Sequence, residues 1–467
     1  MRFGIACRGM NLSSLFTRAG FAIAAFAAFV GSSAATPSIV IDVASGDTLY
    51  QQNATQPWFP ASLSKLMTVF VALKAEREGR ITMNTPMMVS ARAASMAPSK
   101  MGFRPGTLVT LDNALKMLMV KSANDLAVTI AEGVSGSVEA FADEMNASAA
   151  ALGMHESHFV NPNGLPDPRQ ISSARDMAVL GRALYVYFPE HADLFDIGAM
   201  KLGNRVIPTH NGMLGRYPGA DGMKTGFTCA AGFNLVASAT QNGRRLIAVV
   251  LGAPSAKTRT MLAASLLDKA FAGNVTRSGP ALALAATGGE PPDMHEGVCR
   301  HRGKSVASIT AEIEDMSAPL PSAFGQARGS EGSSPSTVAE IASLPRPAFD
   351  PIPVFVGPVP GWNGPIARAN GDSTPIQAYS EDKDEAADAP LKPAPDAQSM
   401  RKGRHRAAPA KHRIAKATKP DKKTTVSKAT AADGKDAKAR STVVKPVKSA
   451  AHAPKAKAKA AAAKTDE

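Results

Sequence analysis

The chain has 467 residues, enough for one large domain or two ordinary ones. Hydrophobic residues make up 44% of the sequence, which supports a real core but excludes one that extends over the whole length. The net charge of +14 comes from the C-terminal end, because residues 401–467 contain 20 Lys+Arg and 5 Asp+Glu. The body of the chain is mildly acidic.

The first 35 residues predict a signal peptide. Three arginines flank or precede an unbroken run of small apolar residues at 19–30, and Ser33-Ala34-Ala35 offers small residues to a signal peptidase. The apolar run is too short for a permanent membrane anchor. We therefore expect residues 1–35 to direct export, with a buried N-terminal helix as the alternative.

Residues 36–275 predict one ordered domain with strands at both ends and helices between them. Ser45-Gly46-Asp47 turns the chain between two runs rich in β-branched residues, and Asn242-Gly243 is a strong hairpin signal. This order indicates an α/β fold in which one antiparallel sheet is flanked by helices, with a second, helical lobe. The expected strands are 38–43, 48–50, 223–228, 233–240 and 245–252, and the expected helices are 62–78, 112–119, 125–132, 137–152, 173–187 and 255–271.

Beyond residue 275 the pattern decays. Residues 276–379 are rich in Pro, Ala and Gly and predict a mostly irregular linker. It has a hint of order around 295–314 and an apolar stretch at 349–362 that its prolines keep extended. Residues 380–467 are low-complexity Ala, Lys and Pro and predict a disordered basic tail.

Three short motifs follow one another in the predicted domain: Ser62-Leu63-Ser64-Lys65, Ser122-Ala123-Asn124 and Lys224-Thr225-Gly226. By chance a Ser-x-x-Lys occurs about twice in a chain of this length, and a Lys-Thr-Gly about 0.1 times. The ordered trio is therefore a specific signal. Together the motifs supply an acyl-transfer site that needs no histidine, metal or cofactor, and the histidines show no metal-ligand spacing.

A serine hydroxyl is a weak nucleophile and needs a base within hydrogen-bond reach. Residues three apart on a helix share a face, so Ser62 and Lys65 meet if the helix begins near Pro60. Lys65 must be neutral to accept a proton, and burial or a like charge such as Lys224 would lower its pKa. The alternative is a helix-start serine followed by a surface lysine, which the apolar surroundings disfavour.

The other motifs predict the remaining parts of the site. Ser122 can relay a proton to a leaving amine, and Asn124 can hold both the substrate backbone and Lys65. Lys224-Thr225-Gly226 on a strand offers a cation, a hydroxyl and an open edge along which a peptide could lie. Gly226 removes a side chain where the substrate comes close. Structural roles are expected for Asp125, the turn Asn161-Pro162-Asn163-Gly164 and His210.

Export would place the mature chain in an oxidising space, where Cys229 and Cys299 could form a disulfide. Cys7 would leave with the signal peptide. Because Cys229 follows the third motif, a bridge would brace the back of the site. Two buried thiols that pack as small hydrophobic groups are the alternative.

These residues resemble the serine-type D-alanyl-D-alanine carboxypeptidases, the low-molecular-mass penicillin-binding proteins of peptidase family S11. The likeness spans residues 36–275 and includes Asn161-Pro162-x-Gly164-Leu165-Pro166 and Ala174-Arg175-Asp176. It implies a penicillin-recognising α/β fold and an acyl-enzyme formed from peptidoglycan pentapeptide stems, with release of the terminal D-alanine. It also implies a role in cell-wall biogenesis and cell shape, and inhibition by β-lactam antibiotics.

The resemblance implies a role for each motif residue. Ser62 is the nucleophile and Lys65 the acylation base, and the amides of Ser62 and Phe227 form the oxyanion hole. Arg259 holds the terminal carboxylate, for which a guanidinium fork is well suited, unless it is a surface helix residue. The implied catalytic residues are Ser62, Lys65, Ser122 and Asn124, and the implied substrate-binding residues are Lys224, Thr225, Gly226, Phe227 and Arg259.

Many members of this family continue into a small β-domain and an amphipathic membrane-binding helix, and neither is evident here. The basic tail is a candidate substitute that would bind anionic wall polymers or lipid headgroups, with a tail that has no fixed partner as the alternative. Nucleic acid is not expected, since the predicted location is the bacterial periplasm or cell wall, with peripheral attachment to the inner membrane as an alternative.

Three other functions stay open. A β-lactamase shares the Ser-x-x-Lys logic, but Glu156 precedes Asn161 without the usual Glu-x-x-Leu-Asn arrangement. A peptidoglycan endopeptidase would carry the same motifs. A non-enzymatic wall-binding protein would need an inactive scaffold, against which the intact trio argues.

Overall fold

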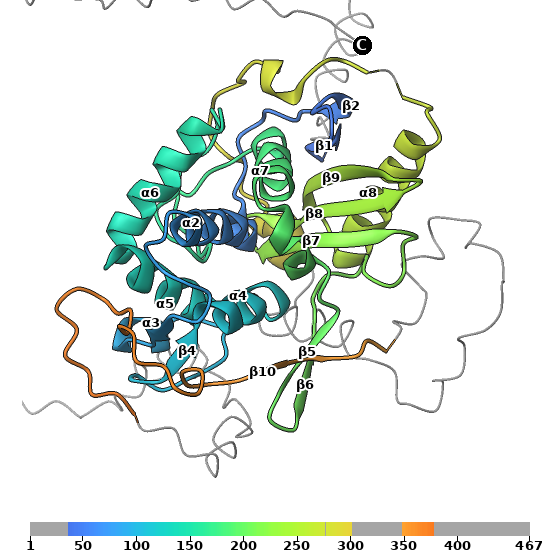
Figure 1. Cartoon of the computed structure of the whole chain (residues 1–467). Helices are drawn as coiled ribbons and strands as arrows, with labels where there is room; N and C mark the ends of the chain where they lie inside the picture. The colour runs from blue at the N-terminus through green and yellow to red at the C-terminus, as the bar shows by residue number, and fades with distance from the viewer. Residues whose placement is uncertain (1–35, 276, 301–347, 378–467) are drawn as a thin grey trace, which may run out of the picture. The chain divides into compact units, whose positions relative to one another are not determined.

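A computed structural model describes residues 36–275, 277–300 and 348–377, shown in colour in Figure 1. The predicted signal peptide, residues 301–347 and the basic tail lie outside the described residues. Within the described part of the chain, no helix is both long and apolar enough to span a bilayer.

A five-stranded antiparallel sheet forms one half of the domain, with the strand order β2-β1-β9-β8-β7 (Figure 1). Asn242 and Gly243 both adopt positive φ angles, 51° and 74°, which lets a two-residue turn join the last two strands. The predicted sheet, built from both ends of the domain, is confirmed. Its strands are β1 (Ser38–Asp42), β2 (Thr48–Gln52), β7 (Ala220–Thr228), β8 (Gly232–Gln241) and β9 (Arg244–Ala253).

The two faces of this sheet bury alternate residues in two separate cores. Ile247 and Val249 lie in one core with helix α7 (Ala174–Tyr187), whereas Leu246 and Ala248 lie in the other with helix α8 (Ala256–Phe271). Successive side chains of a strand point to opposite faces, so one apolar strand serves both cores. The sheet is therefore covered on both sides, as expected for an α/β fold.

The helical lobe surrounds helix α2 (Lys65–Arg77), which is buried along almost its whole length (Figure 1). The sequence predicts a single helix from residue 62, but Ala61–Ser64 form a 3₁₀ turn, η2, and the α-helix begins only at Lys65. The other elements of the lobe are β3 (Pro86–Met88), α3 (Ala91–Ala94), β4 (Leu108–Thr110), α4 (Leu111–Val120), α5 (Asn124–Ser135) and α6 (Val138–Ala151).

Residues 348–377 lie along the helical lobe as an extended strap, seen in orange in Figure 1. Strand β10 (Ile352–Val354) pairs in parallel with β5 (Ala199–Leu202), which pairs with β6 (Arg205–Pro208). Further along, the Gly357 amide donates to Leu108 O (2.7 Å). The sequence correctly predicts an extended stretch here, but it does not predict that the stretch packs on the domain.

The segment 277–300 also returns to the domain. It contains a 3₁₀ turn, η4 (Ala281–Ala283), and a π-helical turn, η5 (Glu296–Arg300). Only η5 lies in the stretch 295–314, where the sequence indicates order. The guanidinium of Arg175, on α7, binds the carbonyl oxygens of Ala281 and Leu282 at 3.1 Å each. This part of the predicted linker is therefore joined to the catalytic domain.

Candidate active site

Ser62 and Lys65 lie side by side at the start of α2. Ser62 belongs to the 3₁₀ turn, in which residues three apart eclipse one another, and the Lys65 Nζ–Ser62 Oγ distance is 3.1 Å. The predicted meeting of the two groups is confirmed, although the turn is tighter than an α-helix. Ala61, immediately before Ser62, has φ 50°, a left-handed conformation that is costly for a residue with a Cβ.

Lys65 is a fully buried lysine that donates three hydrogen bonds. Besides Ser62, its ammonium group binds Asn124 Oδ1 (2.6 Å) and the carbonyl oxygen of Asn163 (2.5 Å). Burial and, to a smaller extent, the charge of Lys224 hold the pKa of Lys65 well below its usual value, while Asp125 opposes this effect. A neutral Lys65 is therefore accessible, and it can take a proton from Ser62.

The second motif lies in the turn between α4 and α5. Ser122 has φ 59°, and its Oγ accepts a hydrogen bond from Lys224 Nζ (3.0 Å). Asn124 begins α5 and is fixed on a second side, because its Nδ2 donates to Ala97 O (2.8 Å). The turn thus aims a hydroxyl and an amide at the two lysines.

The third motif lies on β7, an edge strand of the sheet, so its outer backbone groups are open to a partner. Lys224 is 2% exposed, and burial together with the nearby Arg259 charge lowers its pKa to about 7. A Cβ at Gly226 would approach Pro60 O to 2.9 Å and Ser62 N to 3.2 Å. A larger residue would therefore disturb the start of the catalytic helix.

Of the two remaining predicted binding residues, Phe227 lies on this strand and Arg259 lies on α8. The ring of Phe227 packs on Phe233, with the ring centroids 4.5 Å apart. The part of Phe227 that is predicted to contribute to the site is therefore its backbone amide. Arg259, in the first turn of α8, is 3% exposed, and its Nη1 lies 3.4 Å from Asn234 O. It is close enough to lower the pKa of Lys224, so two buried cations create a positive region suited to an anion. Arg259 is not a surface residue.

Two features of the site are missed by sequence reasoning. The Asn161–Gly164 turn was expected to be structural, yet Asn163 O binds Lys65, and a Cβ on Gly164 would lie 1.9 Å from Ala61 O. Asp125 does not simply cap α5: its carboxylate accepts the amides of Met101 (3.1 Å) and Gly102 (2.8 Å). The Asn163-Gly164 pair was the available sequence signal for the role of the Asn161–Gly164 turn.

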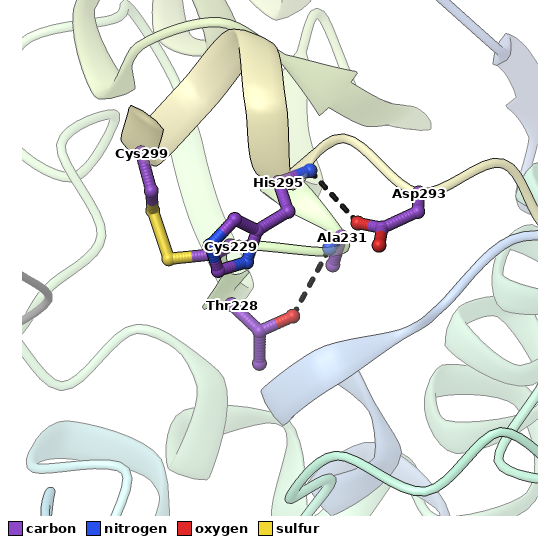
Figure 2. The surroundings of a disulfide bond; sticks show 6 residues. All are labelled: Thr228, Cys229, Ala231, Asp293, His295 and Cys299. Carbon is purple, nitrogen blue, oxygen red and sulfur yellow. Dashed lines mark hydrogen bonds between the residues drawn. A yellow bond between two sulfur atoms is a disulfide. The ribbon is translucent and has the colours of Figure 1, made fainter. Parts of the chain in front are cut away.

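Cys229 and Cys299 form a disulfide in the structure, with a Cα–Cα distance of 5.7 Å. Figure 2 shows the bond next to Thr228 and Ala231, at the end of β7. It joins the segment 277–300 to the strand that carries the third motif. The two cysteines are thus paired rather than separate buried thiols.

A serine beside a buried lysine of lowered pKa, a second buried lysine and an open strand edge are the parts that a serine acyl-transfer site requires. Comparison with known proteins identifies the family. The sequence model described as D-alanyl-D-alanine carboxypeptidase matches residues 24–255. The chain is 33% identical over 249 residues to D-alanyl-D-alanine carboxypeptidase DacB2 of Mycobacterium tuberculosis, covering 50% of this chain and 82% of that protein. The chain belongs to the D-alanyl-D-alanine carboxypeptidase family, peptidase family S11.

Two further comparisons set the extent of the likeness. D-alanyl-D-alanine carboxypeptidase DacF of Bacillus subtilis is 35% identical over 241 residues, 51% of this chain and 62% of that protein. The chain therefore spans less than two thirds of that relative's length. Penicillin binding protein 5 from Haemophilus influenzae is 36% identical, with a TM-score of 0.50 over 51% of this chain and 71% of that one. The fold is the penicillin-recognising α/β fold that the sequence predicts.

Proposed function

We propose that this protein is a serine D-alanyl-D-alanine carboxypeptidase that trims the stem peptides of peptidoglycan through an acyl-enzyme on Ser62. The observation that carries the proposal is the contact of Ser62 Oγ with Lys65 Nζ at 3.1 Å, in a chain of this family. The lowered pKa of Lys65 makes the neutral form of this amine, which can accept the serine proton, easier to reach.

The proposed reaction has two halves. Lys65 takes the Ser62 proton as Oγ attacks the carbonyl carbon of the penultimate D-alanine, and the amides of Ser62 and Phe227 bind the resulting oxyanion. The C–N bond then breaks, and the proton that Lys65 took from Ser62 passes through the Ser122 hydroxyl, which is bound to Lys224, to the leaving amine. Water hydrolyses the ester in the second half and restores the serine.

The buried pair Lys224 and Arg259 supports exo- rather than endo-cleavage. Lys224 lies on the strand on which the substrate would pair and Arg259 lies close to it, and the carboxylate of a terminal D-alanine would offset part of their positive charge. Thr225 adds a hydroxyl from the same strand. Arg259→Gln should therefore lower kcat/KM for a D-Ala-D-Ala peptide by about 10- to 100-fold, the loss expected for hydrogen bonds to a charged group.

The matched control for this experiment is the substrate. A peptide that ends in D-Ala-D-alaninamide lacks the carboxylate, so the wild type should cleave it poorly and Arg259→Gln should make little further difference. An equal loss on both peptides would show that Arg259 acts only through the structure. The enzyme would then lack the proposed reason to prefer a free C-terminus.

The structure gives little support to a β-lactamase. Glu156, the only candidate for a water-activating glutamate raised by the sequence, binds the Thr287 amide (3.0 Å) and Ser173 Oγ (3.5 Å). Among the described residues it makes no hydrogen bond to Ser62 or Lys65. Slow hydrolysis of bound penicillin is the expected outcome, and digestion of cross-linked muropeptides would separate carboxypeptidase from endopeptidase activity.

We propose export to the periplasm or cell wall from the character of residues 1–35 and from the disulfide, which persists in oxidising compartments. Inhibition by β-lactam antibiotics follows from the same acylation chemistry. For the tail, we propose salt-dependent binding to anionic wall polymers or headgroups through its excess of lysine and arginine. Binding that survives 1 M salt would contradict that proposal.

A further inference from the structure

Strand β7 contains one extra residue just before the third motif. In the pairing of β7 with β8, Asp221 is skipped, because Ala220 and Gly222 lie opposite consecutive residues of β8. This irregularity is a β-bulge, which bends an antiparallel strand and redirects the side chains near it. β7 is the edge strand of the sheet (Figure 1), so among the described strands only β8 pairs with it and sets its register.

The extra residue decides to which face of the sheet Lys224 points. With the bulge, Lys224 lies opposite Val236, whose side chain packs in the core on the α7 side of the sheet. Without it, Lys224 would lie opposite Leu235, which packs in the core on the α8 side. Paired residues share a face, and a shift of one residue exchanges the faces. The contact of Lys224 Nζ with Ser122 Oγ at 3.0 Å therefore depends on the bulge.

The carboxylate of Asp221 ties the bulge to the two neighbouring strands. Its Oδ1 accepts a hydrogen bond from Ser238 Oγ at 2.7 Å, and its Oδ2 accepts one from Thr240 Oγ1 at 2.6 Å, both on β8. Arg245 of β9 donates through its Nε to the same Oδ2 at 2.9 Å. Hydrogen bonds to an ionised group are stronger than those between neutral groups. Three donors on two strands thus fix one carboxylate on the edge strand.

Helix α7 supports the same residue through Tyr185. This side chain is 5% exposed, and its hydroxyl donates to the carbonyl oxygen of Asp221 at 3.1 Å. Burial, together with the charge of Asp221, raises the pKa of Tyr185, so the hydroxyl stays protonated and remains a donor. A Cβ at Gly222 would lie 2.6 Å from both Tyr185 Oη and Ser238 Oγ. Glycine is therefore required where these groups meet the bulge.

We propose that Asp221 is a positioning residue for the acylation step, which fixes the bulge and thereby turns the Lys224 ammonium toward Ser122. The inference rests on the proposed acyl transfer at Ser62 and adds a residue that none of the three motifs contains. The hydrogen-bond partners of the Asp221 carboxylate all lie outside the motifs, so its effect on the reaction passes through Lys224.

The test measures the rate of acylation of the full-length protein by a fluorescent penicillin. Asp221→Asn keeps the size of the side chain but replaces one acceptor oxygen with an NH₂ group. It should slow acylation by about 10- to 100-fold, the loss expected when a reacting group is misplaced by about 1 Å. In the Lys224→Met background the same substitution should cause no further loss. A loss of equal size in both backgrounds would mean that Asp221 only supports the fold, and would overturn the inference.

Asp42→Asn is the matched control. Asp42, on β1, accepts a hydrogen bond from the Nε of the neighbouring Arg244 at 2.6 Å, and β9 and β8 separate β1 from β7. This variant should lose stability but keep the wild-type rate of acylation. The inference would fail if Asp42→Asn were as slow as Asp221→Asn, or if Asp221→Asn reacted at the wild-type rate.

Thr240→Val provides a second test if Asp221→Asn does not fold. It removes one of the three donors to the carboxylate, so acylation should slow by about 3- to 10-fold, and again not further in the Lys224→Met background. A wild-type rate for Thr240→Val would overturn the inference alone. If penicillin does not acylate the wild type at all, the proposed function fails first, and this inference fails with it.

Discussion

The centre of the domain and the segments that follow it are built in opposite ways. Around α2, side chains are almost wholly buried, yet two lysines lie there with lowered pKa values. In residues 277–300 and 348–377 most side chains are exposed, and attachment depends on backbone hydrogen bonds and one disulfide. The centre therefore carries reactive groups at a cost in stability, whereas the outer segments add stability and carry no motif residue.

The largest effect should come from the centre. Lys65→Met leaves Ser62 without a base, so acylation should slow by about 10²- to 10⁴-fold. Stopped-flow acylation by penicillin measures this directly. Lys74→Met, on the exposed side of the same helix, should acylate at the wild-type rate, since Lys74 only pairs with Glu78 at 3.8 Å. Equal rates for the two variants would remove Lys65 from the mechanism.

The next effect concerns an outer segment. The disulfide closes a loop with a sequence separation of 70, so replacing both cysteines should lower the free energy of unfolding by up to about 4 kcal/mol. Guanidinium unfolding of Cys229→Ser/Cys299→Ser checks this. Reduction of the wild type should reproduce the loss, and reductant should not affect the double variant. If the double variant is as stable as the wild type, the disulfide fixes only the segment 277–300 and does not stabilise the domain.

Lys224→Met, in contrast, is expected to raise the free energy of unfolding. The pKa of Lys224 is about 7 in the folded protein against 10.5 when exposed, so the unfolded chain binds more protons between these values. The free energy of unfolding of the wild type therefore rises with pH between these two values. The buried charge destabilises the fold most below pH 7. The variant should gain about 5 kcal/mol at pH 6 and nothing above pH 10.5, while losing activity.

Unfolding curves at pH 6, 8 and 10.5 measure this dependence. Lys257→Met is the control, because Lys257 is an exposed lysine on α8. A stability difference for Lys224→Met that does not vary with pH would contradict the picture of a buried charge.

The smallest effect tests the strap. Val354, in β10, is 4% exposed, and Val354→Ala should lower the free energy of unfolding by about 1.5 kcal/mol through loss of two buried methyl groups. Its neighbour Phe355 is 44% exposed, and Phe355→Ala should change stability by less than about 0.5 kcal/mol. Both variants should keep wild-type acylation rates. Slower acylation by Val354→Ala would show that the strap also supports the reactive centre, which would contradict the distinction between the two regions.

Much of the centre could be predicted from the sequence because its signals are local. Apolar periodicity, the Asn242-Gly243 turn and a capping serine such as Ser173, whose Oγ accepts the Asp176 amide at 3.1 Å, each act within a few residues. Helix α7 and the last hairpin consequently lie within a residue or two of their expected bounds. The motif residues meet because these elements position them.

The rest depends on contacts without a side-chain signature. The strap pairs by backbone groups with strands more than 150 residues away, for which proline-rich sequence gives no pattern. The role of Asn163 is carried by its carbonyl oxygen, so its residue type does not reveal it. The 3₁₀ turn at Ser62, found in place of the expected α-helix, has two distant segments packed against it at Gly164 and Gly226, and the local sequence does not show these contacts.

The most direct test of Ser62 as the nucleophile is labelling with a fluorescent penicillin, followed by peptide mapping. We expect one modified residue, Ser62, with no label on Ser62→Ala and full labelling of Ser64→Ala, which alters a serine in the same turn. Label on another residue, or on Ser62→Ala, would contradict the assignment of the nucleophile and the mechanism built on it.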